Sequence, residues 1–214
     1  PPPDDSVDLV VTSPPYFALR SYRDGDEHYD GQIGSEASPQ EFLEALWAAT
    51  AEMVRVVKPS GSIFVNLGDK YVDKSLMGLP WRYAIGCMDD LGLILRAEIV
   101  WSKPSGLPES VTDRVRRSHE QWFHFTLEPH YFTAIDEIRV PHEGQHPVHW
   151  SDDDNYKWNR DPGGKTRQWE PRGKRVYNPL GKLPGSVWSI PSEPLQVPDS
   201  LGVEHFAAFP QEWP

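Results

Sequence analysis

Short β-rich runs alternate with helical segments through the first half of the chain. The runs that indicate buried strands are Val7–Val11, Ser62–Leu67 and Leu93–Trp101. Each run is followed by proline, glycine or other residues that end a strand or turn the chain. Because right-handed crossovers through helices make such strands parallel, we expect the strand exits at Ser13, Gly68 and Ser102 to share one edge of a sheet.

Two helices are expected between these runs. The first begins at Ser38, an N-cap serine that is followed by Pro39 and by a capping-box glutamate, Glu41. Apolar residues then recur at helical spacing until the segment Lys58–Gly61 ends the helix. The second helix is expected from residue 79 to about residue 91.

Two further β-rich runs follow the third strand. Gln121–Leu127 and His130–Ile135 are separated by Glu128 and Pro129, which favours an antiparallel hairpin. Strands that alternate with helices and then end in a hairpin predict the α/β class. The expected sheet is Rossmann-like, mostly parallel, with the antiparallel hairpin at its edge.

Length and composition limit the class of protein. At 214 residues, with 25% charged and 38% hydrophobic residues, the chain fits one globular domain with a substantial insertion. No apolar run approaches membrane-spanning length. The single cysteine, Cys87, excludes a disulfide framework and suits a reducing cytoplasm. The chain begins at Pro1 on the approach to a strand, which favours a piece of a longer polypeptide.

Charge is unevenly distributed along the chain. The formal net charge is −11, yet residues 155–182 hold eight Lys/Arg and two Asp/Glu, so this window is +6 and the remainder −17. A basic island in an acidic protein is typical of a localised phosphate contact, although a solvated loop would show the same charges.

Periodicity vanishes between Pro141 and Gly185, a stretch too long for an ordinary connection. Its aromatic and basic residues alternate, which favours contact with a nucleic-acid backbone; an apolar mini-core with a basic rim is the alternative. We therefore predict a core at 1–140, a nucleic-acid-contact insertion at 141–185 and a return to the core at 186–214. The predicted nucleic-acid contacts in the insertion are Lys157, Arg160, Lys165, Arg167, Arg172, Lys174 and Arg175. No metal site is expected, because His142, His146 and His149 lack a carboxylate or cysteine at ligand spacing.

The segment Thr12–Tyr16 is the most specific motif. Ligands of open α/β sheets bind beyond the carboxyl ends of the strands, and the two prolines free backbone carbonyls from the ladder. A hydroxyl, a directed carbonyl and an aromatic ring therefore converge at one strand exit. A planar base with an amino group needs two acceptors and a ring on which to stack; a proline-rich exit with a packing tyrosine is the alternative. Asn66 and Asp69 end the second strand on the same side, although Asn-Leu-Gly-Asp is equally a plain turn.

The motif resembles that of the amino-methylating DNA methyltransferases, whose hallmark is (Asp/Asn/Ser)-Pro-Pro-(Tyr/Phe) after a strand. The resemblance covers nearly the whole chain, in the permuted motif order called the β class. The other matching segments are Gly61–Asp69, Trp101–Pro104, Pro108–Ser110, Arg114 with His119 and Glu120, Val187–Pro191 and His205–Pro210.

This resemblance implies a class I methyltransferase fold that uses S-adenosylmethionine and acts on double-stranded DNA after the target base is flipped out. The implied catalytic residues are Ser13, Pro14, Pro15 and Tyr16. The implied cofactor-binding residues are Thr12, Ser13, His205, Phe206, Ala207, Phe209 and Pro210. The basic residues Lys103 and Arg114 would add to the DNA contacts.

Serine at the first motif position resembles the cytosine-N4 branch more than the adenine-N6 branch. One departure from the family pattern is that no Phe-x-Gly-x-Gly turn, which holds the cofactor in the family, occurs before Pro214, so the expected sheet is incomplete. Two alternatives stay open: an amino group of RNA or protein as the target, and a non-catalytic DNA-binding remnant or subunit. The expected setting is a prokaryotic or phage restriction–modification system in the cytoplasm, with a homodimer left open.

Overall fold

The computed structural model describes residues 1–19, 31–105, 109–142, 178–193 and 210, together with two-residue strands at 23–24 and 27–28. The chain divides into two compact units, one formed by residues 1–132 with 186–214 and the other by residues 133–185. The predicted division into core, insertion and return stays a prediction, because most of the insertion lies outside the described residues.

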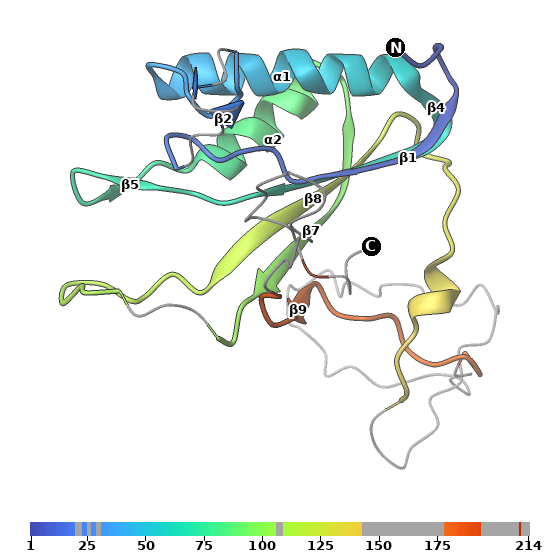
Figure 1. Ribbon diagram of the computed structural model, residues 1–214. Helices are drawn as coiled ribbons and strands as arrows, with labels where there is room; N and C mark the ends of the chain where they lie inside the picture. Colours follow the sequence, from blue (N-terminus) through green and yellow to red (C-terminus); the bar gives the residue numbers. More distant parts are fainter. Residues whose placement is uncertain are drawn as a thin grey trace, which may run out of the picture. The chain divides into compact units, whose positions relative to one another are not determined.

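The first unit is built on a mixed sheet of five strands (Figure 1). In spatial order they are β1 (Val7–Thr12), β4 (Val57–Leu67), β8 (His119–Thr126), β7 (Ile94–Ser102) and β9 (Val187–Ser189). The pairs β1–β4 and β7–β9 are parallel, whereas β8 is antiparallel to both of its neighbours. All strands except β8 therefore run in one direction. The α/β class, with a mostly parallel sheet that includes an antiparallel pair, here β7 and β8, is confirmed. The antiparallel strand β8 lies between β4 and β7 and not at the edge of the sheet, where it was expected.

Short elements and helices complete the described chain. They are β2 (Arg23–Asp24), β3 (Glu27–His28), α1 (Pro39–Val56), β5 (Tyr71–Val72), β6 (Ser75–Leu76), α2 (Leu79–Asp89) and the 3-10 helix η1 (Ile135–Ile138). No helix in these ranges is both long and apolar enough to pass through a bilayer.

Helix α1 begins as its sequence predicts. The Ser38 hydroxyl accepts a hydrogen bond from the Glu41 amide at 3.2 Å, and the Glu41 carboxylate accepts one from the Ser38 amide at 3.1 Å. This reciprocal pair satisfies two amides that the helix itself cannot, and Pro39 fills the first turn. The helix ends at Val56 and β4 follows at once, five residues before the predicted strand start at Ser62.

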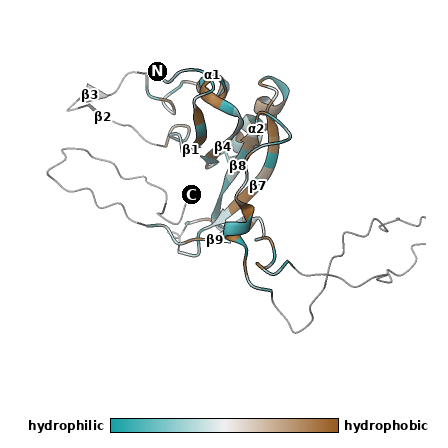
Figure 2. Cartoon of the chain, turned by 90° about the vertical axis from the view of Figure 1, so that its right-hand side faces the viewer, coloured by the Kyte–Doolittle hydropathy of each residue, from teal (hydrophilic) through white to brown (hydrophobic). Residues whose placement is uncertain are grey.

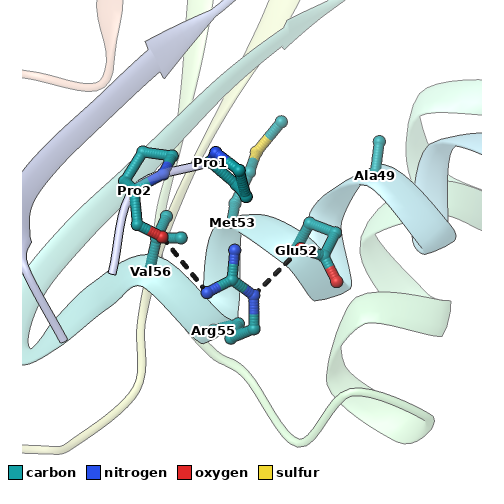
Figure 3. Close-up of a pocket in the computed structure, with 7 residues that line it drawn as sticks. All are labelled: Pro1, Pro2, Ala49, Glu52, Met53, Arg55 and Val56. Atoms are coloured by element: carbon teal, nitrogen blue, oxygen red, sulfur yellow. Dashed lines mark hydrogen bonds and ion pairs between the residues drawn. The ribbon is translucent and has the colours of Figure 1, made fainter. Parts of the chain in front are cut away.

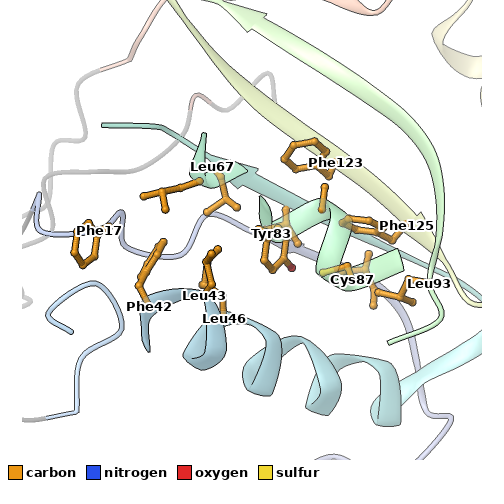
Figure 4. Packing of buried hydrophobic residues seen from close by; sticks show 14 of the residues in the cluster. Phe17, Phe42, Leu43, Leu46, Leu67, Tyr83, Cys87, Leu93, Phe123 and Phe125 are labelled. Atoms are coloured by element: carbon orange, nitrogen blue, oxygen red, sulfur yellow. The ribbon is translucent and has the colours of Figure 1, made fainter. Parts of the chain in front are cut away.

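Helices α1 and α2 cover one face of the sheet (Figure 1). Figure 4 shows apolar side chains from both helices meeting those of β4 and β8, among them Leu46 of α1, Tyr83 of α2 and Phe125 of β8. The Tyr83 hydroxyl and the Thr50 hydroxyl share a hydrogen bond of 2.7 Å, so the polar groups buried in this layer are paired.

A second apolar cluster is formed by other side chains of the same sheet. It consists of Ile99, Trp101, Trp122 and Ile190, with Val11, Phe64 and Trp188 packed against it. Figure 2 shows apolar residues along β1 and β7, the strands that contribute Val11 and Trp101. His124 stacks on Phe64 with ring centroids 4.2 Å apart. Burial, aided by the charge of Arg96, lowers the pKa of His124 to about 4, so the ring is neutral at pH 7.

The predicted partner of β8 in the hairpin is wrong. Residues 130–134 form no strand, and the residues after them form η1. The physical reason is that β4 and β7 already pair with both edges of β8, which leaves no free edge for a third strand. The chain instead leaves the sheet, and the Phe132 amide donates to the Ser60 carbonyl at 2.9 Å.

Candidate functional site

The carboxyl ends of β1, β4 and β7 meet at one edge of the sheet. Thr12, the last residue of β1, pairs with Val65 of β4, and Ser102, the last residue of β7, pairs with His119 at the start of β8. The predicted common edge for the exits at Ser13, Gly68 and Ser102 is therefore confirmed. Side chains from four strands or their exits come together there.

Asn66 of β4 is the centre of this group. Its side-chain oxygen accepts hydrogen bonds from the Ser13 hydroxyl at 3.2 Å and from the Tyr16 hydroxyl at 2.7 Å. Its amide nitrogen donates to the Gln121 carbonyl at 3.1 Å, which fixes the direction of the amide. Asn66 is only 1% exposed, so the loss of these bonds would leave buried polar groups unpaired.

The Tyr16 hydroxyl also contacts a charged pair. It lies 2.7 Å from Oε2 of Glu120 as well as from Asn66 Oδ1, so its single proton is donated to one of these two acceptors at a time. Glu120 also forms an ion pair with Lys103. The Lys103 ammonium lies 4.1 Å from the centre of the Trp101 ring, a cation–π contact. The result is a continuous polar chain from β1 through β4 and β8 to β7, which we call the Ser13–Lys103 network: Ser13, Asn66, Tyr16, Glu120 and Lys103.

The Tyr16 ring packs directly on the backbone of Gly68. A Cβ atom at position 68 would lie 2.5 Å from Cε2 and 2.7 Å from Cδ2 of the ring. Glycine is therefore needed here for close approach. With its hydroxyl bonded and its Cδ2 and Cε2 atoms against Gly68, the ring is held in one orientation.

Asp69 has a structural task beside the network. Its carboxylate accepts hydrogen bonds from the amides of Gly78 at 3.0 Å and Leu79 at 3.1 Å, where α2 begins. It also lies 3.6 Å from the guanidinium of Arg117. Through these contacts the buried side chain of Asp69 joins the start of α2 to the segment before β8.

Cys87 is unsuited to nucleophilic catalysis. It lies on α2 in the core between helices and sheet (Figure 4). Burial raises the pKa of its thiol to about 12, so the thiol stays protonated at neutral pH.

A shallow hollow of about 260 Å³ lies elsewhere, between the N-terminal residues and the end of α1 (Figure 3). It is lined by Pro1, Pro2, Ala49, Glu52, Met53, Arg55 and Val56. Its arginine already donates to the Glu52 carboxylate and the Pro2 carbonyl. These residues precede β1 and β4, at the edge of the sheet opposite to the network, and their chemistry indicates no site.

The structure describes only some of the predicted site residues. Ser13, Tyr16 and Lys103 are brought together, and Pro210, among the predicted cofactor residues, is buried. Arg114 forms an ion pair with Glu109 at 2.8 Å. Those outside the described residues are Lys157, Arg160, Lys165, Arg167, Arg172, Lys174, Arg175, His205, Phe206, Ala207 and Phe209.

The sequence alone assigns no role to two members of the network, Asn66 and Glu120. The Asn-Leu-Gly-Asp sequence at Asn66 is equally typical of a plain turn, and Glu120 only forms part of a segment that matches the family. The available signal was a polar residue at the end of a buried strand, where its side chain meets the neighbouring strand exits. Neither contact could be identified without the strand order.

Comparison with known proteins identifies relatives. A family model described as DNA methylase matches residues 7–214. The Type II methyltransferase M.XycI of Xanthomonas campestris pv. cyanopsidis is 40% identical over an alignment of 171 positions, and the match covers 66% of this chain and 55% of that protein. The Type II methyltransferase M.PvuII of Proteus hauseri is 25% identical over an alignment of 239 positions, gaps included, and the match covers 99% of this chain and 63% of that protein.

A solved structure shares the fold. The PvuII DNA methyltransferase (cytosine-N4-specific) has a TM-score of 0.64 with 18% identity, and the match covers 99% of this chain and 62% of that chain. The chain spans about half the length of the curated relatives M.XycI and M.Cfr9I, at 55% and 53%.

Proposed function

Because this chain belongs to the family of DNA methylases that modify exocyclic amino groups, we propose that the protein methylates such a group on a flipped base of double-stranded DNA. The methyl donor is S-adenosylmethionine and the target is cytosine N4. The Type II names of the relatives support a place in a restriction–modification system. The observation that carries the proposal is the hydrogen bond from Ser13 to Asn66.

That hydrogen bond prepares Ser13 as an acceptor. An amide oxygen can only accept, so the single proton of the Ser13 hydroxyl points toward Asn66. The lone pairs of Oγ are then available to an amino hydrogen of the base, and the Pro14 carbonyl accepts the other. Two such bonds localise the lone pair on the amino nitrogen, which makes the nitrogen a better nucleophile.

Tyr16 supplies a rigid stacking surface. Its ring is already fixed by Gly68, Asn66 and Glu120, so little conformational entropy remains to be lost when a base stacks on it. Stacking on an aromatic side chain contributes about 1–3 kcal/mol per base, which helps to offset the few kcal/mol that flipping costs.

The residues at the exit of β1 suit a cofactor as far as the structure describes them. Thr12 and Ser13 carry hydroxyl groups where β1 ends, and Pro210, the one described residue of the segment His205–Pro210, is buried. When bound, S-adenosylmethionine would supply a sulfonium methyl group: the S–CH3 bond would break as the N–CH3 bond forms, S-adenosylhomocysteine would leave, and the amino nitrogen would lose one proton to solvent. The protein's part is alignment and the exclusion of water from the reacting atoms.

Cytosine N4 is favoured over adenine N6 by the serine of the motif, and the related PvuII enzyme is named as cytosine-N4-specific.

The test is to incubate the protein in its full encoded length with labelled S-adenosylmethionine and unmethylated bacteriophage DNA, and then to identify the methylated nucleoside. We expect N4-methylcytosine. N6-methyladenine would contradict the base assignment only, and 5-methylcytosine would contradict the mechanism, because ring-carbon methylation needs a cysteine nucleophile. Absence of any methylated base would favour a DNA-binding subunit.

The basic window is expected to bind the DNA backbone. It contains Lys157, Arg160, Arg167 and Arg175, which lie outside the described residues. Their replacement by glutamine should weaken binding to every DNA sequence alike and reduce the slope of affinity against salt by about one per lost phosphate contact. Fluorescence anisotropy at several salt concentrations measures both quantities. An unchanged slope would mean that the window is a solvated loop.

A further inference from the structure

The segment 109–118, between β7 and β8, carries an apolar side chain that is not packed in the core. It leaves the sheet at the edge where the Ser13–Lys103 network lies, because β7 ends and β8 begins there. Val115 in this segment is 86% exposed, the largest value among the exposed large hydrophobic residues of the described chain. Its neighbours in sequence are Arg114 on one side, and Arg116 and Arg117 on the other.

The segment is held in a defined shape. The Glu109 carboxylate forms an ion pair with Arg114 at 2.8 Å and accepts a hydrogen bond from the Arg117 amide at 3.2 Å, which closes the turn. The Arg114 guanidinium also lies 3.7 Å from the centre of the Tyr71 ring on β5. Arg114 is therefore occupied in fixing the segment to the β5–β6 hairpin. Val115 therefore lies on a turn that the contacts of Glu109 and Arg114 hold in place.

The segment is also joined to the base pocket. Arg117 donates to the His119 carbonyl at 3.2 Å and to the Gln121 side chain at 3.0 Å, on both sides of Glu120 in the sequence. The ion pair between Arg117 and Asp69, at 3.6 Å, reaches the residue after Gly68. The position of Val115 is thus set by the same strand ends that set Tyr16.

We propose that Val115 is a wedge that enters the base stack beside the flipped base, while Arg116 contacts the adjacent phosphate. This inference rests on the proposed function and assigns it a DNA-facing surface. An apolar side chain between cations suits DNA: the charges approach phosphates, and the valine fills space that the departing base leaves. Arg116 is exposed and, in the part of the chain that the structure describes, has no ion-pair partner.

The test compares Val115→Ala and Arg116→Ala with two controls on surfaces away from this segment. Ile85→Ala removes a half-exposed apolar side chain of α2, and Lys58→Ala removes a charge at the opposite edge of the sheet. Methylation of bacteriophage DNA first identifies the target sequence. The substrates are then a short duplex that contains this target, and the same duplex with an abasic site opposite the target base. Affinity is measured by anisotropy and kcat/KM by methyl transfer.

On the intact duplex, Val115→Ala should lower kcat/KM on the order of tenfold, whereas Val115→Leu should retain most of it. On the abasic duplex the defect should shrink, because flipping is already easier there. Arg116→Ala should weaken binding and lower the salt slope by about one. If both variants behave like the controls in binding and in rate, the inference is wrong, even where the wild type methylates an amino group. If the wild type methylates nothing but both variants bind DNA more weakly than the controls, then Val115 and Arg116 do form a DNA-binding surface, and the proposed function is wrong.

Discussion

Replacement of Ser13 by alanine is expected to lower kcat by roughly five- to a hundredfold. The substitution removes one of two acceptors for the amino hydrogens, and an unpaired hydrogen in a buried pocket costs about 1–3 kcal/mol. If this cost is felt mainly in the transition state, it appears in kcat rather than in KM. Single-turnover methylation separates chemistry from product release.

The matched control is Ser75→Ala, in the exposed β5–β6 hairpin. It should leave the rate unchanged, and neither serine variant should alter the melting temperature by more than a few degrees, because neither side chain is in the core. A rise in KM with kcat preserved would contradict the assignment of Ser13 and would indicate a residue that binds ground state and transition state equally.

Replacement of Gly68 by alanine is expected to cost as much as the removal of the Tyr16 ring. The new methyl group would lie 2.5 Å from the ring, which cannot move aside without taking its hydroxyl away from Asn66 and Glu120. Loss of base stacking, worth about 1–3 kcal/mol, corresponds to a fall in kcat/KM of roughly five- to a hundredfold. Steady-state methylation kinetics measure it.

Two comparisons make this prediction specific. Combining Gly68→Ala with Tyr16→Ala should add little to either single loss, since both remove the same stacking surface. Gly185→Ala, at a glycine where a Cβ would meet no other atom within 4 Å, should be neutral. Fully additive losses would show that Gly68 acts on something other than the Tyr16 ring.

The elements that local signals specify were predictable from the sequence. The capping box at Ser38 and the strand exits at Ser13 and Gly68 depend on residues close together in the chain, and the structure confirms them. The strand predicted at His130–Ile135 is wrong because a β-rich composition does not show whether the edge of a partner strand is free. Both edges of β8 are already paired.

The site was predictable only in part, for a related reason. The sequence indicated that Ser13 and Tyr16 lie at a strand exit. Their partners Asn66 and Glu120 are separated from Tyr16 by 50 and 104 positions. Such contacts depend on β8 lying between β4 and β7, an order that no local pattern encodes. For the residues beyond the described ranges, the predicted cofactor and DNA contacts stay predictions.

The strand order has a consequence for the nascent chain. As the ribosome releases β1, α1 and β4, these can already assemble, since β1 pairs with β4. Strand β7 emerges next, but its antiparallel neighbour in the sheet is β8, which is synthesised later. Glu120 and the Gln121 carbonyl, which fix Tyr16 and Asn66, arrive on that same strand. Insertion of β8 is therefore the step of folding that both joins the two halves of the sheet and completes the Ser13–Lys103 network, where we propose that the base binds. A chain stalled before residue 119 would have neither.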